Sequence, residues 1–347
     1  MALHCLIMAG GQGTRFWPVS TKQRPKQYMN ILGGPHSLLQ GSLKRITPVS
    51  EVLHRHIVTV EAQRTLAEEQ GGEFLPKENL IFEPSGRNTA PCIYLSLVSL
   101  LEKGASLDDC VAVLPSDHVI LDEESFQSDL IKASELALKN NSITLIGIKP
   151  TSPHTGYGYI ELGSTYSEGV NKVSSFKEKP VLEVAQKYLE SGNFLWNAGM
   201  FISPIGMLLE ELKSNVPEME KLEQDFRSRI KNNESINDLY DQLPKESIDY
   251  AVIEKSKNVD VVTAQFDWND LGSWDALESV IEKKEGNIIT KTEGIQTLAA
   301  TGNVIHAPGK KVSLIGVENL VVIVEGDQVV ILPKNQSQKV KELNQDL

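Results

Sequence analysis

The sequence predicts an α/β fold, in which a mostly parallel sheet is flanked by helices and followed by a small β region. Over roughly the first 285 residues, short apolar runs typical of strands alternate with longer stretches of helical spacing. Such alternation is typical of a parallel sheet with helices on both faces. After about residue 285, β-branched runs separated by turn residues show no helical period. We therefore expect a catalytic domain over residues 1–285 and a small β domain with a polar tail over residues 286–347.

The expected helices and strands follow from local spacing. Within residues 88–103, Pro91 suits the first turn of a helix, and Ile93, Leu97 and Leu100 recur at helical intervals. Further helical stretches are expected over residues 124–139, 217–240 and, loosely, 335–347. Strands are expected at residues 6–8, 56–60, 111–114, 143–148, 158–162, 200–203 and 259–266.

Composition and charge exclude several classes of protein. The 347 residues are 40% hydrophobic and carry a net charge of -12, which argues against a nucleic-acid groove. No segment reaches the length of apolar chain that a membrane span needs, and no leader is recognisable. Cys5, Cys92 and Cys110 lack metal-ligand spacing and lie in apolar stretches, so we expect buried free thiols. These observations predict a cytoplasmic protein with no nucleic-acid or membrane partner.

A glycine-rich turn follows the first expected strand. The segment AGGQGTRFWP does not fit a dinucleotide fingerprint, because Phe16 stands where the third glycine is required, and the chain has no P-loop string. A bare turn after a strand of an open α/β sheet can instead bring backbone N–H groups close to phosphate oxygens. Arg15 and Lys26 add positive charge nearby, although a simple tight turn and a solvated arginine are the structural alternatives.

The motifs along residues 9–274 resemble the sugar-1-phosphate nucleotidyltransferase family, and in particular its mannose-1-phosphate guanylyltransferase branch. The segments that carry the resemblance, in chain order, are AGGQGTRFWPVS, RPKQ, FEPSGRNTAP, LPSDH, GIKPTSPHTGYGYI, FKEKP, FLWNAGMF, ESIDYAVIEK and WNDLGSW. The resemblance implies a Rossmann-like, GT-A-like nucleotidyltransferase fold. The C-terminal strands resemble the short β-helix-like tail of compact members, and we expect no isomerase domain.

The implied reaction transfers GMP from GTP to α-D-mannose 1-phosphate and releases pyrophosphate. In-line attack at the α-phosphate needs positioning and positive charge more than a nucleophilic triad. The resemblance assigns catalytic roles to Arg15 and Lys26. It places Mg²⁺, or Mn²⁺, on Asp117 and Asp270, whose carboxylate oxygens are the ligands that Mg²⁺ prefers. Without the resemblance, either aspartate could equally be a turn residue.

The resemblance also divides the remaining site between the two substrates. The implied nucleotide-binding residues are Gly10, Gly11, Gly13, Thr14, Ser85, Gly86 and Asn88. The implied sugar phosphate-binding residues are Gly156, Tyr157, Glu178, Lys179, Asn197 and Gly199. A carboxylate suits sugar hydroxyls and an ammonium suits a monophosphate, which agrees with this division. The direction of Arg87 stays open, and we expect His118 and His154 to be structural.

Three alternatives remain beside this interpretation. The same chemistry on another base or sugar 1-phosphate would use the same core motifs. A non-catalytic regulatory subunit that binds a nucleotide sugar is disfavoured by the full set of charged residues. A Rossmann-type dehydrogenase is disfavoured by Phe16. A homodimer formed through the C-terminal β region is a further expectation.

Overall fold

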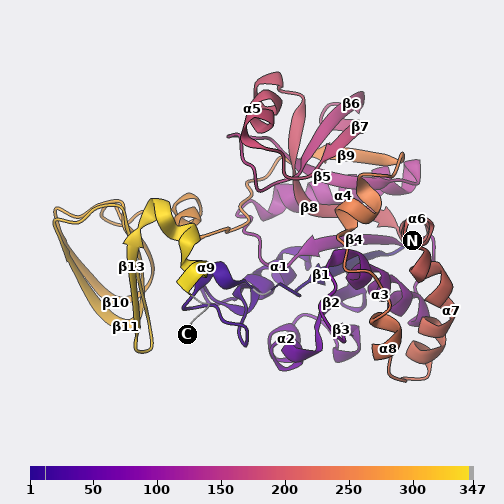
Figure 1. Ribbon diagram of the computed structural model, residues 1–347, viewed down its shortest axis with the longest axis horizontal. Helices are drawn as coiled ribbons and strands as arrows, with labels where there is room; N and C mark the ends of the chain where they lie inside the picture. Colours follow the sequence, from indigo (N-terminus) through magenta and orange to yellow (C-terminus); the bar gives the residue numbers. More distant parts are fainter. Residues whose placement is uncertain (12, 344–347) are drawn as a thin grey trace. The chain divides into compact units, whose positions relative to one another are not determined.

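The computed structural model describes residues 1–11 and 13–343 (Figure 1). The chain forms two compact units, each built from separate stretches of sequence. The first unit contains residues 1–10, 43–115 and 122–267, and the second contains residues 11–42, 116–121 and 268–347. Among the described residues, no helix has both the length and the apolar character that crossing a membrane requires.

A nine-stranded sheet forms the centre of the first unit. Its strands lie in the order β3-β2-β1-β4-β8-β5-β9-β7-β6. Their bounds are β1 (Leu3–Met8), β2 (Arg55–Val60), β3 (Leu80–Glu83), β4 (Cys110–Pro115), β5 (Ile143–Ile148), β6 (Tyr159–Ser167), β7 (Val170–Lys177), β8 (Phe194–Pro204) and β9 (Val259–Thr263). Strands β3, β2, β1 and β4 are parallel, as are β5 and β9, whereas β8 runs antiparallel to both β4 and β5. The predicted α/β class is confirmed.

Two helices of this unit, at residues 89–102 and 123–140, lie close to the predicted ranges, and several others fall where no helix was predicted. Their bounds are α2 (Arg64–Gly71), α3 (Thr89–Glu102), α4 (Glu123–Asn140), α5 (Leu182–Ser191), α6 (Ile205–Asn215), α7 (Pro217–Lys231) and α8 (Asn237–Tyr240), and α1 (Leu38–Ile46) precedes them. The polar stretch at 217–240 is two helices, because Asn233 adopts a left-handed φ of 56° and interrupts it.

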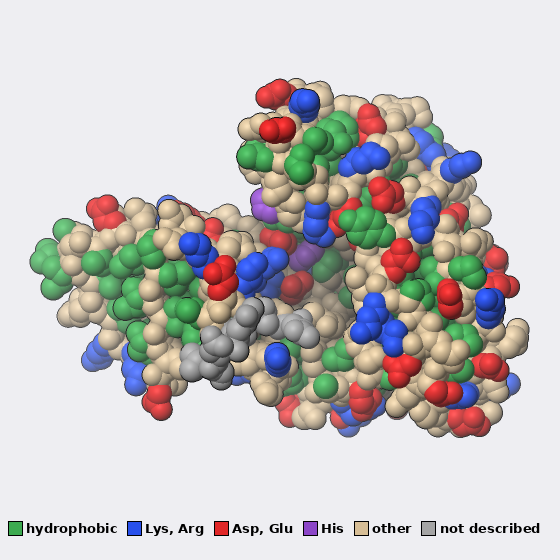
Figure 2. All heavy atoms as spheres, in the orientation of Figure 1, with side chains coloured by type: hydrophobic (Ala, Val, Ile, Leu, Met, Phe, Trp, Pro, Cys, Tyr) green, Lys and Arg blue, Asp and Glu red, His purple; other side chains and the backbone are tan. Residues whose placement is uncertain are grey.

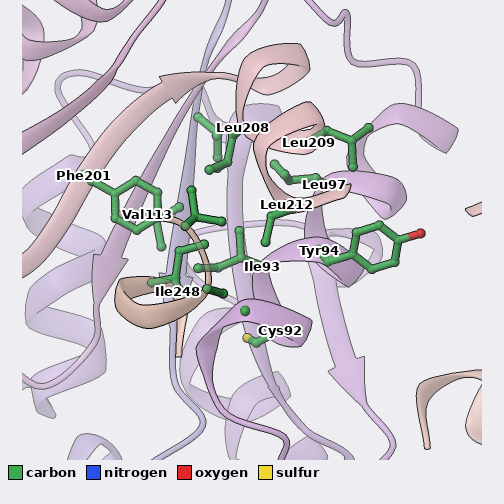
Figure 3. Close-up of a cluster of buried hydrophobic side chains, with 14 of the residues drawn as sticks. Cys92, Ile93, Tyr94, Leu97, Val113, Phe201, Leu208, Leu209, Leu212 and Ile248 are labelled. Atoms are coloured by element: carbon green, nitrogen blue, oxygen red, sulfur yellow. The ribbon is translucent and has the colours of Figure 1, made fainter. Parts of the chain in front are cut away.

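Alternate residues of the strands face opposite sides of the sheet. Leu6, Val58 and Val113 belong to a large buried cluster together with side chains of α3, α6 and α7. Figure 3 shows residues of α3 and α6 pointing toward Val113 of β4 and Phe201 of β8. Ile57 faces the other side, where it contacts Gly71 of α2. The sheet is therefore covered by helices on both faces, as strand–helix alternation predicts.

The second unit contains a four-stranded sheet in the order β10-β11-β12-β13. Its elements are β10 (Ile288–Leu298), β11 (Val304–Ile315), β12 (Leu320–Glu325), β13 (Gln328–Pro333), a short helical turn η8 (Lys334–Lys339) and α9 (Val340–Leu343). The first three strands are parallel and β13 is antiparallel. The predicted tail helix is present up to residue 343, and residues 344–347 of that prediction lie outside the described residues.

Buried asparagines connect successive turns of this sheet. The Asn303 side-chain amide and backbone N–H both donate to Asn287 Oδ1, at 2.9 and 3.0 Å. Asn303 Oδ1 in turn accepts from the backbone N–H of Leu320 at 2.9 Å. Each asparagine thus satisfies backbone groups of the neighbouring turn, which is how a β-solenoid can bury polar backbone.

The glycine-turn segment and the C-terminal strands share one core. Trp274 is fully buried, and its ring centroid lies 4.9 Å from that of Phe16 and 5.3 Å from that of His306. Val304 and Val321 complete the same cluster. Residues on both sides of the predicted boundary at 285 and 286 therefore pack together.

Apolar side chains are also exposed on the C-terminal strands. Figure 2 shows hydrophobic side chains gathered over this sheet. The large exposed apolar residues of these strands are Leu298, Ile315, Val329 and Ile331.

Candidate active site

A cavity of about 300 Å³ lies within the second unit. It brings together segments that are far apart in the sequence. Its lining residues are Gly13, Arg15, Lys26, Asp117, His118, Asp270, Leu271 and Gly272. The residues predicted for catalysis and for metal binding thus share one cavity with a glycine of the turn.

Lys26 is the buried cation of this cavity, with 5% of its surface exposed. Its Nζ donates to the backbone carbonyls of Asp270 at 2.7 Å and Leu271 at 3.0 Å. The same Nζ lies 2.9 Å from Asp117 Oδ2. A lysine ammonium has three N–H donors, and these three acceptors match them. Lys26 therefore ties Asp117 to the loop that carries Asp270.

Asp117 is held in its ionised form. Burial alone would raise the pKa of this carboxyl, but the Lys26 ammonium and His118 hold it below the usual value. His118 accepts a hydrogen bond at Nδ1 from Trp268 Nε1 at 3.1 Å, and the two rings meet edge to face. The predicted structural role of His118 fits this contact, although the residue also lines the cavity.

Gly13 is the turn glycine whose conformation the cavity requires. Its φ is +56°, and a Cβ atom there would lie 2.5 Å from Lys26 Cβ and 2.6 Å from Lys26 N. Ser20 Oγ donates to the Gly13 carbonyl at 2.5 Å, and Gln27 Nε2 donates to the Gly11 carbonyl at 3.1 Å. Any side chain at residue 13 would displace Lys26 from its three partners.

The other predicted residues of the turn differ in their surroundings. Arg15 is exposed, and Thr14 begins the helical turn η1 (Thr14–Phe16). Among the described residues, no atom would lie within 4 Å of a Cβ on Gly11, so these residues leave room for a side chain there. Gly10, in the first unit, would place a Cβ 3.4 Å from Glu83 Oε2. Glu83, for which the motif FEPSGRNTAP predicted no role, is a buried carboxylate that accepts a hydrogen bond from the Tyr240 hydroxyl.

The loop between β3 and α3 carries Ser85, Gly86 and Asn88 in the first unit. Asn88 caps α3, because its Oδ1 accepts from the Thr89 N–H at 2.9 Å. The open question of Arg87 is answered: its guanidinium donates to the Leu243 carbonyl at 2.7 Å and to Asp241 Oδ1 at 3.0 Å. Arg87 thus anchors this loop to the segment after α8.

The residues predicted for the sugar phosphate also lie in the first unit. Glu178 and Asn197 come within reach of each other across a glycine, since a Cβ on Gly158 would lie 2.6 Å from Glu178 Oε2 and 3.3 Å from Asn197 Cβ. The Tyr157 ring stacks on His154, with centroids 3.9 Å apart. The backbone N–H of Gly156 donates to His154 Nδ1 at 3.2 Å, a contact that fits the predicted structural role of His154.

The predicted sugar phosphate-binding side chains differ in how far they are exposed and in what they contact. The Glu178 side chain is 8% exposed, whereas its ion-pair partner Lys179 is 60% exposed. Asn197 Nδ2 donates to Asp249 Oδ1 at 2.9 Å, and its Oδ1 accepts from the Gly199 N–H at 3.1 Å. Gly199 has a φ of +66°, which turns this N–H back toward the asparagine.

Asp249 is a member of this group that the sequence analysis missed. The motif ESIDYAVIEK was recognised, but none of its residues received a role. Burial raises the pKa of Asp249 to about 6, and the neighbouring Glu178 carboxylate adds to the rise, while Asn197 and Lys179 oppose it. An acidic residue between Ile248 and the apolar run AVI was the only signal in the sequence.

A cavity lined by a turn glycine, two cations and two carboxylates can bind phosphate groups and a divalent cation. The family model described as nucleotidyl transferase matches residues 4–286, and a second, described as MannoseP isomerase/GMP-like beta-helix domain, matches residues 296–347. The chain belongs to the nucleotidyl transferase family.

Relatives support the resemblance that the motifs indicated. A Vibrio cholerae protein named putative mannose-1-phosphate guanylyltransferase is 36% identical over 99% of this chain and 74% of its own length. A Salmonella montevideo mannose-1-phosphate guanylyltransferase is 36% identical over 97% of this chain and 72% of its own length. A crystal structure from Thermus thermophilus, described as a mannose-1-phosphate geranyltransferase, has a TM-score of 0.89 and 32% identity and covers 99% of this chain and 98% of its own.

Proposed function

We propose that the chain transfers GMP from GTP to α-D-mannose 1-phosphate, forming GDP-mannose and pyrophosphate. The observation that carries this proposal is the cavity in which Gly13, Arg15, Lys26, Asp117 and Asp270 meet. Family membership and the names of the relatives supply the reaction class and the substrates.

The chemistry suits these residues. A phosphate oxygen of mannose 1-phosphate attacks the α-phosphorus of GTP, and the bond from this phosphorus to the bridging oxygen breaks, so that pyrophosphate leaves. Because the attacking oxygen is already anionic, the step needs no general base. Its barrier comes from repulsion between two anions and from charge that grows on the leaving group. In this proposal Arg15 binds the departing β- and γ-phosphates, and Lys26 adds fixed positive charge; both line the cavity.

Asp117 and Asp270 fit a divalent cation, Mg²⁺ or Mn²⁺. Both line the same cavity, and their hard carboxylate oxygens are ligands that these ions prefer. A bound ion would neutralise phosphate charge and polarise the α-phosphate. Lys26 keeps Asp117 ionised and therefore able to bind a cation.

The remaining residues divide between the substrates in this proposal. Those that take the nucleotide are Gly10, Gly11, Gly13, Thr14, Ser85, Gly86 and Asn88. Those that take the sugar phosphate are Gly156, Tyr157, Glu178, Lys179, Asn197 and Gly199. The exposed Lys179 suits the monophosphate, and the buried Glu178 suits the hydroxyl groups. The homodimer through residues 286–347 and the cytoplasmic location stay predictions, the former supported by exposed Val329 and Ile331.

A pyrophosphate-release assay tests the proposal. It crosses GTP, ATP, CTP and UTP with mannose, glucose and N-acetylglucosamine 1-phosphates in the presence of Mg²⁺. We expect the highest kcat/KM for GTP with mannose 1-phosphate. Equal or better turnover with UTP or with glucose 1-phosphate would assign the chain to another base or sugar, and binding without any turnover would indicate a regulatory subunit.

A further inference from the structure

Asp249 is a carboxylate that the proposed reaction does not use, yet it contacts the residues proposed for the sugar phosphate. Asn197 donates to it at 2.9 Å, and Glu178 and Lys179 are the charged groups that act on it. Asp249, Glu178 and Asn197 all belong to the first unit. The inference drawn from this group rests on the proposed function.

The backbone around Asp249 is fixed by packing. Ile248 is 3% exposed and belongs to the large core cluster, where Figure 3 shows it among side chains of α3 and α6. Its N–H donates to Thr89 Oγ1 at 2.8 Å. Asp249 then opens a wide π-type turn, η6 (Asp249–Ile253), in which the Glu254 N–H donates to the Asp249 carbonyl at 2.9 Å. Such turns are uncommon and occur frequently at functional sites.

The Asn197 amide is oriented from both ends. Its Nδ2 donates to Asp249, its Oδ1 accepts from Gly199, and its backbone N–H donates to the Gly158 carbonyl at 2.8 Å. An amide side chain has two N–H donors and two acceptor lone pairs, so one of each remains after these contacts. A donor beside an acceptor on a rigid group matches two neighbouring hydroxyl groups of a sugar.

We propose that Asp249 is a positioning residue for the sugar phosphate: it fixes the Asn197 amide so that its remaining donor and acceptor meet the sugar hydroxyls. Without a carboxylate at residue 249, Nδ2 would lose its acceptor and the amide could rotate to exchange its nitrogen and oxygen. A rotated amide would present a donor where the sugar meets an acceptor. The expected consequence is weaker binding of mannose 1-phosphate, with little effect on GTP.

Two variants of Asp249 separate the hydrogen bond from the charge. Asp249→Ala removes the acceptor and should raise the KM and Kd for mannose 1-phosphate roughly 10- to 100-fold, with the KM for GTP within about twofold. Asp249→Asn keeps an acceptor oxygen and should restore most of the affinity. Glu254→Gln is the matched control, since it alters an exposed carboxylate at the end of the same turn and should change neither constant.

The pH dependence of the KM for mannose 1-phosphate gives a further test, because it would not change if Asp249 only stabilised the fold. At pH 8 the wild-type carboxylate is ionised and its bond to Asn197 is charge-assisted. Below about pH 6 it takes up a proton, so the wild type should come to resemble Asp249→Asn. The second ionisation of the sugar phosphate, near pH 6, affects the KM of both proteins equally and cancels in the ratio of the two KM values. The ratio of the KM of Asp249→Asn to that of the wild type should therefore fall toward 1 between pH 8 and pH 5.

The outcomes separate this inference from the proposed function. An Asp249→Ala protein that melts at the wild-type temperature with an unchanged KM and Kd for mannose 1-phosphate would overturn the inference alone. Equal loss of affinity for both substrates would also overturn it. A wild type that binds mannose 1-phosphate in calorimetry without releasing pyrophosphate would overturn the proposed function, while weaker binding by Asp249→Ala would still support the inference. If Asp249→Ala does not fold, the pH profile of Asp249→Asn decides.

Discussion

The cavity of the second unit and the sugar-side group of the first unit (Glu178, Lys179, Asn197 and Asp249) each contain a partly buried aspartate, but the two carboxylates have opposite neighbours. In the cavity, Asp117 faces the Lys26 ammonium at 2.9 Å, and its pKa is lowered in spite of burial. In the sugar-side group, Asp249 is buried near another carboxylate, Glu178, and its pKa rises to about 6. Burial raises the pKa of both carboxyls, and the Lys26 ammonium beside Asp117 helps to reverse that rise.

In the proposed function, this difference corresponds to two kinds of ligand. A site with an ionised carboxylate and a fully paired lysine is organised before any ligand arrives, and it suits a metal ion and polyphosphate. A site with two carboxylates and one mostly exposed lysine, Lys179, suits neutral hydroxyl groups beside a single phosphate. Substitutions in the two regions should therefore change different kinetic constants.

The largest effect is expected from Asp117→Ala. The variant removes the carboxylate that Lys26 holds ionised, and turnover should fall roughly 10²- to 10³-fold. Binding of Mn²⁺, followed by electron paramagnetic resonance, should weaken in parallel. Because Lys26 keeps its contacts with the carbonyls of Asp270 and Leu271, circular dichroism should be unchanged.

Asp108→Ala is the control for this variant, because it removes an exposed aspartate close in sequence. It should leave both turnover and Mn²⁺ binding at wild-type values. A folded Asp117→Ala protein with full Mg²⁺-dependent activity would reduce Asp117 to a turn residue and remove the contrast between the two carboxylates.

Arg15→Ala and Lys179→Ala should have smaller and separable effects. Charge on the leaving pyrophosphate grows only in the transition state, so Arg15→Ala should lower kcat by about 10²-fold.

Lys179 faces the attacking monophosphate in our proposal, so Lys179→Ala should raise the KM for mannose 1-phosphate about tenfold. Steady-state kinetics with each substrate varied at a saturating concentration of the other measures both. An unchanged KM and kcat in Lys179→Ala would contradict the division of roles.

Much of the fold was predictable because it depends on local patterns. The helices at 89–102 and 123–140 and the strands β1, β2, β4 and β5 lie within a few residues of the predicted ranges. The position of β8 was not predictable, because its antiparallel pairing with β4 and β5 joins segments far apart in sequence. Tertiary pairing of this kind leaves no periodic signal.

The candidate active site was also predictable only in part, because contacts between distant segments leave no pattern in the sequence. Arg15, Lys26, Asp117 and Asp270 were found from motifs, and the structure brings them to one cavity. The three oxygens around Lys26 were not predictable, since two are backbone carbonyls that have no sequence signature. Asp249 was missed for a similar reason, because its contact with Asn197 spans 52 residues.

The smallest effect on activity is expected from Val321→Ala on β12, whose effect on stability should be confined to the second unit. Val321 is fully buried in the cluster that also contains Phe16 and Trp274, so the variant should destabilise this unit by about 2 kcal/mol. Val329→Ala on β13 is the matched control, because that side chain is 62% exposed, and its effect should stay within about 0.5 kcal/mol. Thermal unfolding measures both changes.

The Kd of the Val321→Ala variant for mannose 1-phosphate should be unchanged at low temperature, since the sugar-side residues belong to the first unit. Equal loss of sugar phosphate affinity and of stability in Val321→Ala would show that the two regions do not act independently.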